Sequence, residues 1–389
     1  MSADPDLELL LFGATGFTGA LTAEYLARNG PEGLRWALAG RNMVKLETVR
    51  ARLAAIEPTL ADLELIHVEL DDRAGLADVV RRARVVVTTV GPYLQHGEPL
   101  VAACAEAGVD YVDLTGEPEF VDRMFVAHHD AAERSGARIV HACGFDSIPH
   151  DLGAYYTVRQ LDTSGPVRMR GVVRAAGTPS GGTFHSAIGA FARARQMRDA
   201  SQQRKRVQPR PDGRRSRAVA GKPQRDSVLG YWLVPLPTID PAVVARSGAA
   251  LDAYGPDFTY SHYAGTKTLR YAAGGALGAG ALGIAAQVPP LRNLLLSRVK
   301  QGHGPEESRR EKSWFTVDFV AEAGGRTLHT RVSGGDPGYG ETAKMLAEAA
   351  LSLAFDDNPE TAGFVTTAQA MGDNLIDRLV AAGITFETL

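Results

Sequence analysis

The N-terminal stretch Leu7-Glu-Leu-Leu-Leu-Phe12-Gly-Ala-Thr-Gly16-Phe-Thr-Gly19 decides the fold. It predicts a short apolar strand, a glycine turn and the start of a helix that continues to Arg28. Glycines in such a turn let the backbone approach a pyrophosphate, and the helix N-terminus offers free N–H groups and a positive dipole end. A tight turn with no ligand is the alternative. The nucleotide-binding residues predicted in this stretch are Gly13, Ala14, Thr15, Gly16, Phe17, Thr18 and Gly19.

Strand and helix signals alternate from this stretch as far as residue 146. Strand candidates separated by helical patterns lie at residues 34–39, 63–70, 85–87, 111–114 and 139–140. Strands that alternate with helices form parallel sheets, and near-continuous apolar strands indicate a sheet covered on both faces. The pattern predicts an α/β fold, with a Rossmann doubly wound parallel sheet over residues 1–146.

The rest of the chain has a different rhythm. Strand signals at 231–234, 258–263, 268–271, 314–322 and 326–332 indicate a second, inserted mixed α/β domain over residues 147–335. Within it, residues 198–227 are polar and basic with almost no apolar anchors, which predicts a mobile surface loop. Residues 336–389 are expected to form a C-terminal helical segment that returns to the Rossmann domain.

The end of the second strand predicts the cofactor. NAD enzymes usually carry a carboxylate there, whereas this chain reads Ala39-Gly40-Arg41-Asn42. An arginine can pair bidentately with a 2′-phosphate, so the sequence favours NADP(H) over NAD. A solvated surface arginine is the alternative. The residues that follow the later strands complete the predicted cofactor set, namely Asp71, Val90, Gly91 and Pro92.

Three side chains are candidates for catalysis. Tyr93 follows the turn after the fourth strand, where it could donate a proton or merely pack. Asp146 and His150 lie just after the last strand of the series, where such a cluster can orient a general acid. The alternative for this cluster is a helix start, with Asp146 or Ser147 as the cap. No ligand spacing typical of a metal site occurs, so no metal is expected.

Composition and charge restrict the partners and the cellular compartment to be expected. The 389 residues carry a formal net charge of −3, which gives no argument for a nucleic-acid partner. Two scattered cysteines and an N-terminus without a signal pattern favour the cytoplasm. Residues 271–291 are free of charge but built mainly from Gly and Ala, so no transmembrane span is expected. A core helix, the lining of an acyl tunnel, and contact with a membrane surface remain open for them.

Several motifs resemble the saccharopine dehydrogenase-like superfamily, and within it the trans-acting enoyl reductases of actinobacterial lipid and polyketide assembly. They are the glycine turn 13–19, Ala39-Gly-Arg41, Gly91-Pro-Tyr93 with Gly97-Glu-Pro99, Cys143-Gly-Phe-Asp-Ser-Ile-Pro149, and Gly334-Gly-Asp-Pro-Gly-Tyr339 with Thr342-Ala-Lys-Met345. Ser180-Gly-Gly-Thr183 with His185 and Ser186 also resembles a family loop, which would touch substrate or cap a helix. The resemblance implies a Rossmann domain, an inserted domain and a returning C-terminal segment.

The resemblance also implies an NADPH-dependent oxidoreductase of lipid metabolism. The first hypothesis is reduction of an enoyl thioester, with an acyl or lipid substrate that an acidic acyl carrier protein could present to the basic loop. A second is C=N chemistry of the saccharopine dehydrogenase type on an amino-acid-like substrate. A third is an NADP-binding lipid-associated or regulatory protein without turnover. Peripheral membrane contact and a homo-oligomer stay open.

Overall fold

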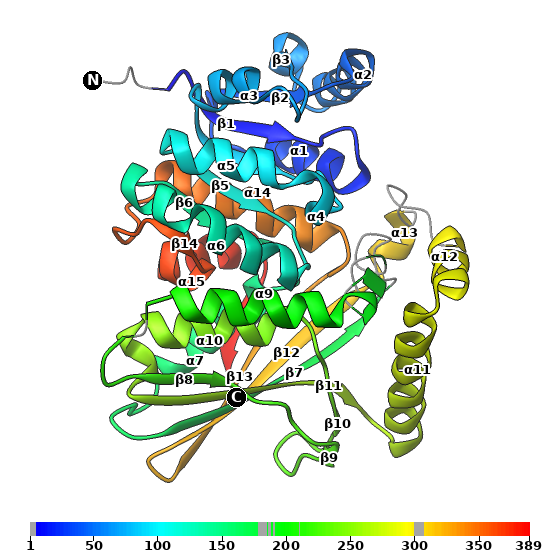
Figure 1. The fold of residues 1–389 in the computed structure, drawn as a ribbon, viewed down its shortest axis with the longest axis vertical. Coiled ribbons are helices and arrows are strands. Elements are labelled where there is room, and N and C mark those ends of the chain that lie inside the picture. Colours follow the sequence, from blue (N-terminus) through cyan, green and yellow to red (C-terminus); the bar gives the residue numbers. More distant parts are fainter. Residues whose placement is uncertain (1–4, 178–184, 186–187, 190, 210, 299–306) are drawn as a thin grey trace.

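The apolar strands of the N-terminal part assemble into a seven-stranded parallel sheet in the computed structural model (Figure 1). The structure describes residues 5–177, 185, 188–189, 191–209, 211–298 and 307–389. The sheet has the order β14-β6-β5-β4-β1-β2-β3, and every pair is parallel. Its strands are β1 (Leu7–Phe12), β2 (Trp36–Gly40), β3 (Glu64–His67), β4 (Ala83–Thr88), β5 (Asp110–Asp113), β6 (Arg138–Val140) and β14 (Gly363–Val365). The Rossmann prediction is confirmed.

Both faces of this sheet are covered, as the continuous apolar strands predicted. All six residues of β1 are buried. Leu9 and Leu11 belong to one core cluster, whereas Leu10 and Phe12 belong to another, because successive strand residues point to opposite faces. The covering helices of this part are α1 (Phe17–Asn29), α2 (Met43–Ala54), η1 (Pro58–Asp62), α3 (Arg73–Val80), α4 (Tyr93–His96), α5 (Glu98–Ala107) and α6 (Pro118–Ser135).

The second sheet is mixed and has eight strands, which confirms the predicted class of the second domain. Its order is β15-β13-β12-β7-β11-β10-β9, and β8 pairs with β11. The pairs β7–β11 and β8–β11 are parallel and the others are antiparallel. The strands are β7 (Val167–Ala176), β8 (Arg215–Ala218), β9 (Gln224–Arg225), β10 (Trp232–Pro235), β11 (Asp257–Thr266), β12 (Trp314–Ala323), β13 (Arg326–Gly334) and β15 (Thr385–Thr388).

The remaining helices connect the two sheets or pack on them, except that α11 and α12 extend to one side (Figure 1). They are α7 (Ile148–Val158), α9 (Ala194–Val207), α10 (Asp240–Ala250), η2 (Asp252–Tyr254), α11 (Leu269–Gln287), α12 (Pro289–Arg298), α13 (Glu307–Arg310), α14 (Gly340–Phe355), α15 (Thr367–Ala370) and α16 (Gly372–Ala381). The C-terminal α14 lies against α1, where the Tyr25 hydroxyl donates to Glu348 at 2.6 Å. The segment is not helical alone, since β14 joins the first sheet and β15 joins the second.

Two local predictions are wrong. Residues 198–227 are not a loop throughout, because they include the second half of α9 and the strands β8 and β9. The basic side chains there find partners: Arg204 is buried against α6 and pairs with Asp122. Residues 268–271 do not form a strand, because α11 begins at Leu269. Leu269 and Arg270 have high helix propensities, which outweigh the β-propensity of Thr268 and Tyr271.

Within the described residues, no single helix is long and apolar enough to cross a membrane. The bent pair α11 and α12 passes that test only when its two helices are taken together, and their axes differ by 115°.

Candidate active site

A cleft of about 1140 Å³ lies where the two sheets face each other, at the carboxyl ends of the parallel strands. In doubly wound sheets, ligands bind at this edge. The glycine turn and the loops after β4, β5 and β6 form one side. Residues from the end of β7, from α9 and from α12 form the other. Pro337, Gly338, Tyr339 and Thr342 of the C-terminal segment also line the cleft, so the signature loop at 334–345 lies beside the glycine turn.

The glycine turn has the geometry of a pyrophosphate cradle. Gly13 has φ +88°, in the left-handed region that favours glycine. A Cβ on Gly19 would lie 2.2 Å from the Gly13 carbonyl oxygen, so the turn closes only with glycine there. No side chain caps α1, and its first turn carries no acidic residue. The free N–H groups of this helix N-terminus therefore face the cleft, which is what a bound pyrophosphate requires.

The predicted cofactor residues do not all line the cleft. Gly16, Phe17, Thr18, Gly19, Gly91 and Pro92 do, whereas Gly13, Ala14, Thr15 and Val90 do not. The Gly91–Pro92 peptide is cis. Arg41 and Asp71 are exposed and lie beyond the cleft lining. Neither side chain has a hydrogen bond or an ion pair within the part of the chain that the structure describes.

Arg41 nevertheless stands at the right end of the right strand. β2 is the neighbour of β1, so its carboxyl end lies beside the glycine turn. The next residue, Asn42, caps α2 by accepting a hydrogen bond from the Lys45 N–H at 3.0 Å. That cap fixes the backbone next to Arg41 and leaves the guanidinium free for a phosphate. The role of Arg41 with a 2′-phosphate stays a prediction.

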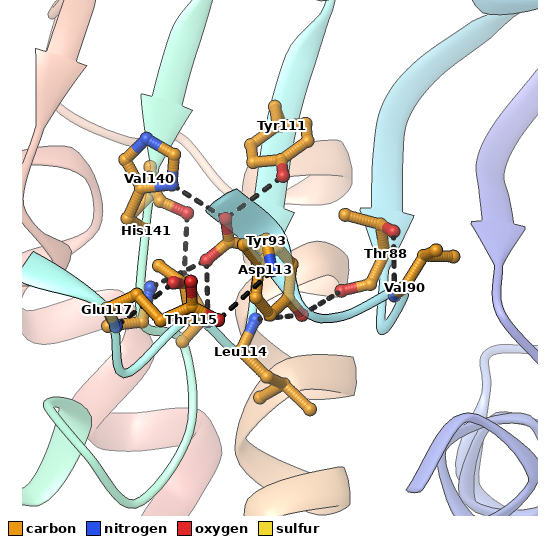
Figure 2. Close-up of polar contacts among 12 residues, drawn as sticks. Thr88, Val90, Tyr93, Tyr111, Asp113, Leu114, Thr115, Glu117, Val140 and His141 are labelled. Carbon is orange, nitrogen blue, oxygen red and sulfur yellow. Dashed lines mark hydrogen bonds and ion pairs between the residues drawn. The ribbon is translucent and has the colours of Figure 1, made fainter. Parts of the chain in front are cut away.

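Tyr93 lines the cleft, but its hydroxyl is hydrogen-bonded to two backbone groups (Figure 2). The hydroxyl donates to the Thr88 carbonyl at 3.2 Å and accepts from the Leu114 N–H at 3.1 Å. Burial raises the pKa of this phenol well above its usual range. In this conformation Tyr93 ties the end of β4 to the end of β5.

The buried carboxylate of Asp113 fixes the loops that bear the cleft residues (Figure 2). It accepts hydrogen bonds from the Thr115 and Ala142 N–H groups at 3.0 and 2.9 Å, and its Oδ2 lies 2.7 Å from His141 Nδ1. The Tyr111 hydroxyl also donates to it at 3.0 Å. One carboxylate thus joins the carboxyl ends of β5 and β6, which are adjacent strands.

The sequence is similar to known proteins along its whole length. A model of the saccharopine dehydrogenase NADP binding domain matches residues 9–140. A protein of Mycobacterium tuberculosis named as a trans-acting enoyl reductase is 38% identical, with 100% of this chain and 99% of that protein aligned. A trans-acting enoyl reductase of Mycobacterium bovis (strain BCG) is 34% identical over 99% of this chain and 98% of its own. The chain belongs to the trans-acting enoyl reductase subfamily of the saccharopine dehydrogenase-like oxidoreductases.

Membership in the trans-acting enoyl reductase subfamily confirms the resemblance drawn from the motifs. The chain is an NADP-dependent oxidoreductase with an NADP(H) cofactor. The fold is that of a saccharopine dehydrogenase from Saccharomyces cerevisiae, whose structure superposes with a TM-score of 0.57 at 12% identity, over 98% of this chain and 100% of that one. At that identity the superposition shows the fold and not the substrate.

In this enoyl reductase homologue, Asp146 is the predicted catalytic residue with a carboxylate at the cleft. It is half-buried, and its side chain has no hydrogen bond or ion pair among the described residues. The pKa of Asp146 is raised to about 6, chiefly by burial and also by the charge of Asp240, while His150 acts to lower it. Gly116 leaves room for this carboxylate, since a Cβ there would lie 2.9 Å from Asp146 Oδ2.

His150 lies behind the cleft wall and is 2% exposed. Its Nδ1 is 2.9 Å from Asp240 Oδ1, and its ring contacts the edge of Phe145 and of His262. His150, Asp240 and His262 could geometrically hold a metal ion, since their ligand atoms lie within 4.8 Å of one another. Burial lowers the pKa of His262 to about 3, so His262 stays neutral. Asp240 already has His150 as a close partner through Oδ1, and the absence of a metal stays a prediction.

The structure adds residues that sequence reasoning missed. Asp240 comes from α10, far along the chain from His150, and no local pattern joins the two. Glu117 accepts from the Tyr93 and Leu94 N–H groups at 3.1 and 3.0 Å and so holds the start of α4 against the cleft. The run Asp113-Leu-Thr-Gly-Glu-Pro118 directly after a buried strand is the signal that could have pointed to Glu117. Of the Ser180–Ser186 motif, all but His185 lies outside the described residues.

Proposed function

We propose that this protein reduces the C=C bond of an α,β-unsaturated acyl thioester, with Asp146 as the proton donor. The observation that carries the proposal is a carboxyl group with a raised pKa in the same cleft as the pyrophosphate cradle. NADPH supplies the hydride for the β-carbon when it is bound. The residues of this chain must then bind the acyl group, protect the site from water and protonate the α-carbon.

Asp146 is suited to the proton transfer. A pKa of about 6 keeps a useful fraction of the carboxyl protonated near neutral pH, which an ordinary aspartate would not do. The group has no competing hydrogen-bond partner among the described residues, so its proton remains available to a substrate carbon. Tyr93 is the side chain for which the sequence suggested proton donation, but its hydroxyl donates to the Thr88 carbonyl. We therefore assign the proton transfer to Asp146 and the positioning of the loop to Tyr93.

The cleft offers both parts of an acyl thioester a suitable surface. Leu94, Phe145 and Leu296 give it an apolar lining for the acyl chain. Arg193 and Arg292 also reach it, as does Arg123. Coenzyme A and the phosphopantetheine arm of an acyl carrier protein both carry phosphate, which arginine binds well. An acidic carrier protein is thus a partner that this charge pattern would attract.

The arginines also favour a second candidate. A dicarboxylate amine, the kind of substrate that C=N oxidoreductases of the saccharopine dehydrogenase type use, would need convergent cations. Arg193 is less available for that role, because it is paired with Glu119 through Nε at 2.7 Å and through Nη2 at 2.5 Å. A carboxylate ligand would have to displace this existing carboxylate, whereas an acyl chain needs no such exchange.

The test is NADPH consumption, followed by its absorbance loss with the full-length protein. Enoyl thioesters of several chain lengths are presented on coenzyme A and on an acyl carrier protein, and imines of amino acids with a keto acid serve as the competing substrates. Turnover of the thioesters alone is expected. Turnover of the imines alone would replace the proposal with the second candidate. NADP(H) binding without turnover of either would favour a binding or regulatory protein.

A further inference from the structure

The helices α11 and α12 form an arm, residues 269–298, that stands off the two sheets (Figure 1). Among the side chains of α11 whose burial is described, Ala272 and Ala286 alone are buried. The large apolar side chains are open instead: Leu277 is 75% exposed and Ile284 is 71% exposed. Others exposed along the arm are Leu269, Tyr271, Leu282, Val288, Leu291 and Leu294. Contiguous apolar surface of this kind marks a site of interaction.

Water alone is a poor environment for this arm. α11 contains five glycines, and each costs roughly 1 kcal/mol relative to alanine in a helix interior. A Cβ on Gly274, Gly275, Gly278 or Gly280 would meet nothing within 4 Å, so these glycines are not required by close packing within the described chain. A helix that is apolar all round is typical of a buried or a membrane environment. The arm therefore needs a cover beyond the described residues of this chain.

The charged residues of the arm indicate which kind of surface binds it. Residues 267–298 contain Lys267, Arg270, Arg292 and Arg298 and no acidic residue, although the whole chain carries a net charge of −3. The cations bracket the uncharged stretch at its two ends, and Tyr271 lies beside one of them. Basic groups flanking an apolar segment are attracted to anionic lipid headgroups, and aromatic rings sit at that level of a bilayer.

We propose that the arm inserts into one leaflet of an anionic membrane. The sharp bend between Gln287 and Pro289 prevents the two helices from crossing a bilayer as one straight span. Both helices would lie near the headgroups, with Leu277 and Ile284 in the acyl region and Arg270 and Arg298 at the phosphates.

The insertion would bring the cleft to the membrane, because Arg292 and Leu296 of α12 also line the cleft. A hydrophobic acyl chain would then pass from the bilayer to the site along α12. This consequence rests on the proposed function, whereas membrane binding itself does not.

A second copy of the chain is the competing cover. Leu277, Ala281, Ile284 and Val288 lie at spacings of four, three and four, which is the stripe that a partner helix would use. The experiment below separates the two, since a dimer needs no lipid.

The test is co-sedimentation of the full-length protein with vesicles of phosphatidylglycerol mixed with phosphatidylcholine, and with phosphatidylcholine alone. The double variant Leu277→Gln/Ile284→Gln is expected to bind the mixed vesicles roughly a hundredfold more weakly, since two large side chains leave the lipid. The matched control Val44→Gln/Val380→Gln changes two exposed apolar residues elsewhere and is expected to bind like wild type. Arg270→Gln/Arg298→Gln is expected to weaken binding to the mixed vesicles several-fold and to leave binding to phosphatidylcholine vesicles unchanged.

Calorimetric titration with NADPH checks that each variant is folded. No sedimentation of the wild type with either vesicle would overturn the proposal, as would equal weakening in the test and control variants. A dimer in analytical ultracentrifugation that Leu277→Gln/Ile284→Gln dissociates, without vesicle binding, would assign the arm to a second copy instead. These readouts need no turnover, so they stand apart from the assay of the proposed reaction.

Discussion

Replacing Asp146 by asparagine should lower activity and raise stability, because the carboxylate is costly to hold in the cleft wall. Its pKa moves from 3.8 to about 6 on folding, chiefly through burial. That difference corresponds to about 3 kcal/mol against the folded state once the group is ionised, and less because the side chain is half-buried rather than enclosed. Asparagine has nearly the same shape and no charge, so Asp146→Asn removes this cost.

Because the pKa of Asp146 is raised on folding, the gain in stability should depend on pH in a defined way. Below about pH 3 the carboxyl is protonated in both the folded and the unfolded state, because both pKa values lie above that pH, so the variant gains nothing there. As pH rises from about 4 to about 6, the unfolded state releases its proton first, and the wild type loses stability relative to the variant. Above about pH 6 the difference is constant. Thermal unfolding at about pH 3 and about pH 8 should therefore give nearly equal midpoints at the first pH and a midpoint several degrees higher for Asp146→Asn at the second.

The substitution that raises stability should lower catalytic activity. If Asp146 is the acid, the wild-type kcat/KM is flat below about pH 6 and falls tenfold for each pH unit above it. Asp146→Asn should lower kcat by roughly 10²–10⁴ and abolish this slope, while NADPH affinity stays the same. Glu98→Gln is a suitable control, since it neutralises an exposed acid that does not line the cleft. A variant that keeps the slope, or one that gains no stability at pH 8, would refute the reasoning.

Three further predictions concern the cofactor and the fold. Gly19→Ala should abolish NADPH binding in calorimetry, because its Cβ would lie 2.2 Å from a carbonyl oxygen, whereas Gly165→Ala, which meets nothing, should bind normally. Arg41→Ala should weaken NADPH roughly tenfold to a hundredfold and NADH hardly at all, and equal weakening of both would exclude contact with the 2′-phosphate. Arg204→Ala should lower the free energy of unfolding by about 3–5 kcal/mol, because it leaves a buried carboxylate unpaired. Arg81→Ala, in an exposed ion pair, should cost at most about 1 kcal/mol in the same denaturant titration.

The sequence predicted well what local physics determines. The six apolar residues of β1 and the glycines of the following turn need no partner elsewhere in the chain to specify a strand, a turn and a helix N-terminus. Repetition of that unit predicted the parallel sheet. The wrong predictions concern residues whose structure depends on a partner far away in the sequence. Arg204 looks like a solvated charge until Asp122, 82 residues earlier in the chain, is placed beside it.

The candidate site illustrates the same limit more sharply. A motif can mark Asp146 as polar and near a strand end, but it cannot state the pKa of its carboxyl. That value depends on how deeply the cleft wall buries the group and on Asp240, which α10 brings in from the second domain. The Asp240 charge in turn is held by His150 on α7. The strength of the acid is therefore a property of the contact between the two domains. A change that loosens that contact should weaken the proton donor even where every residue of the motif remains in place.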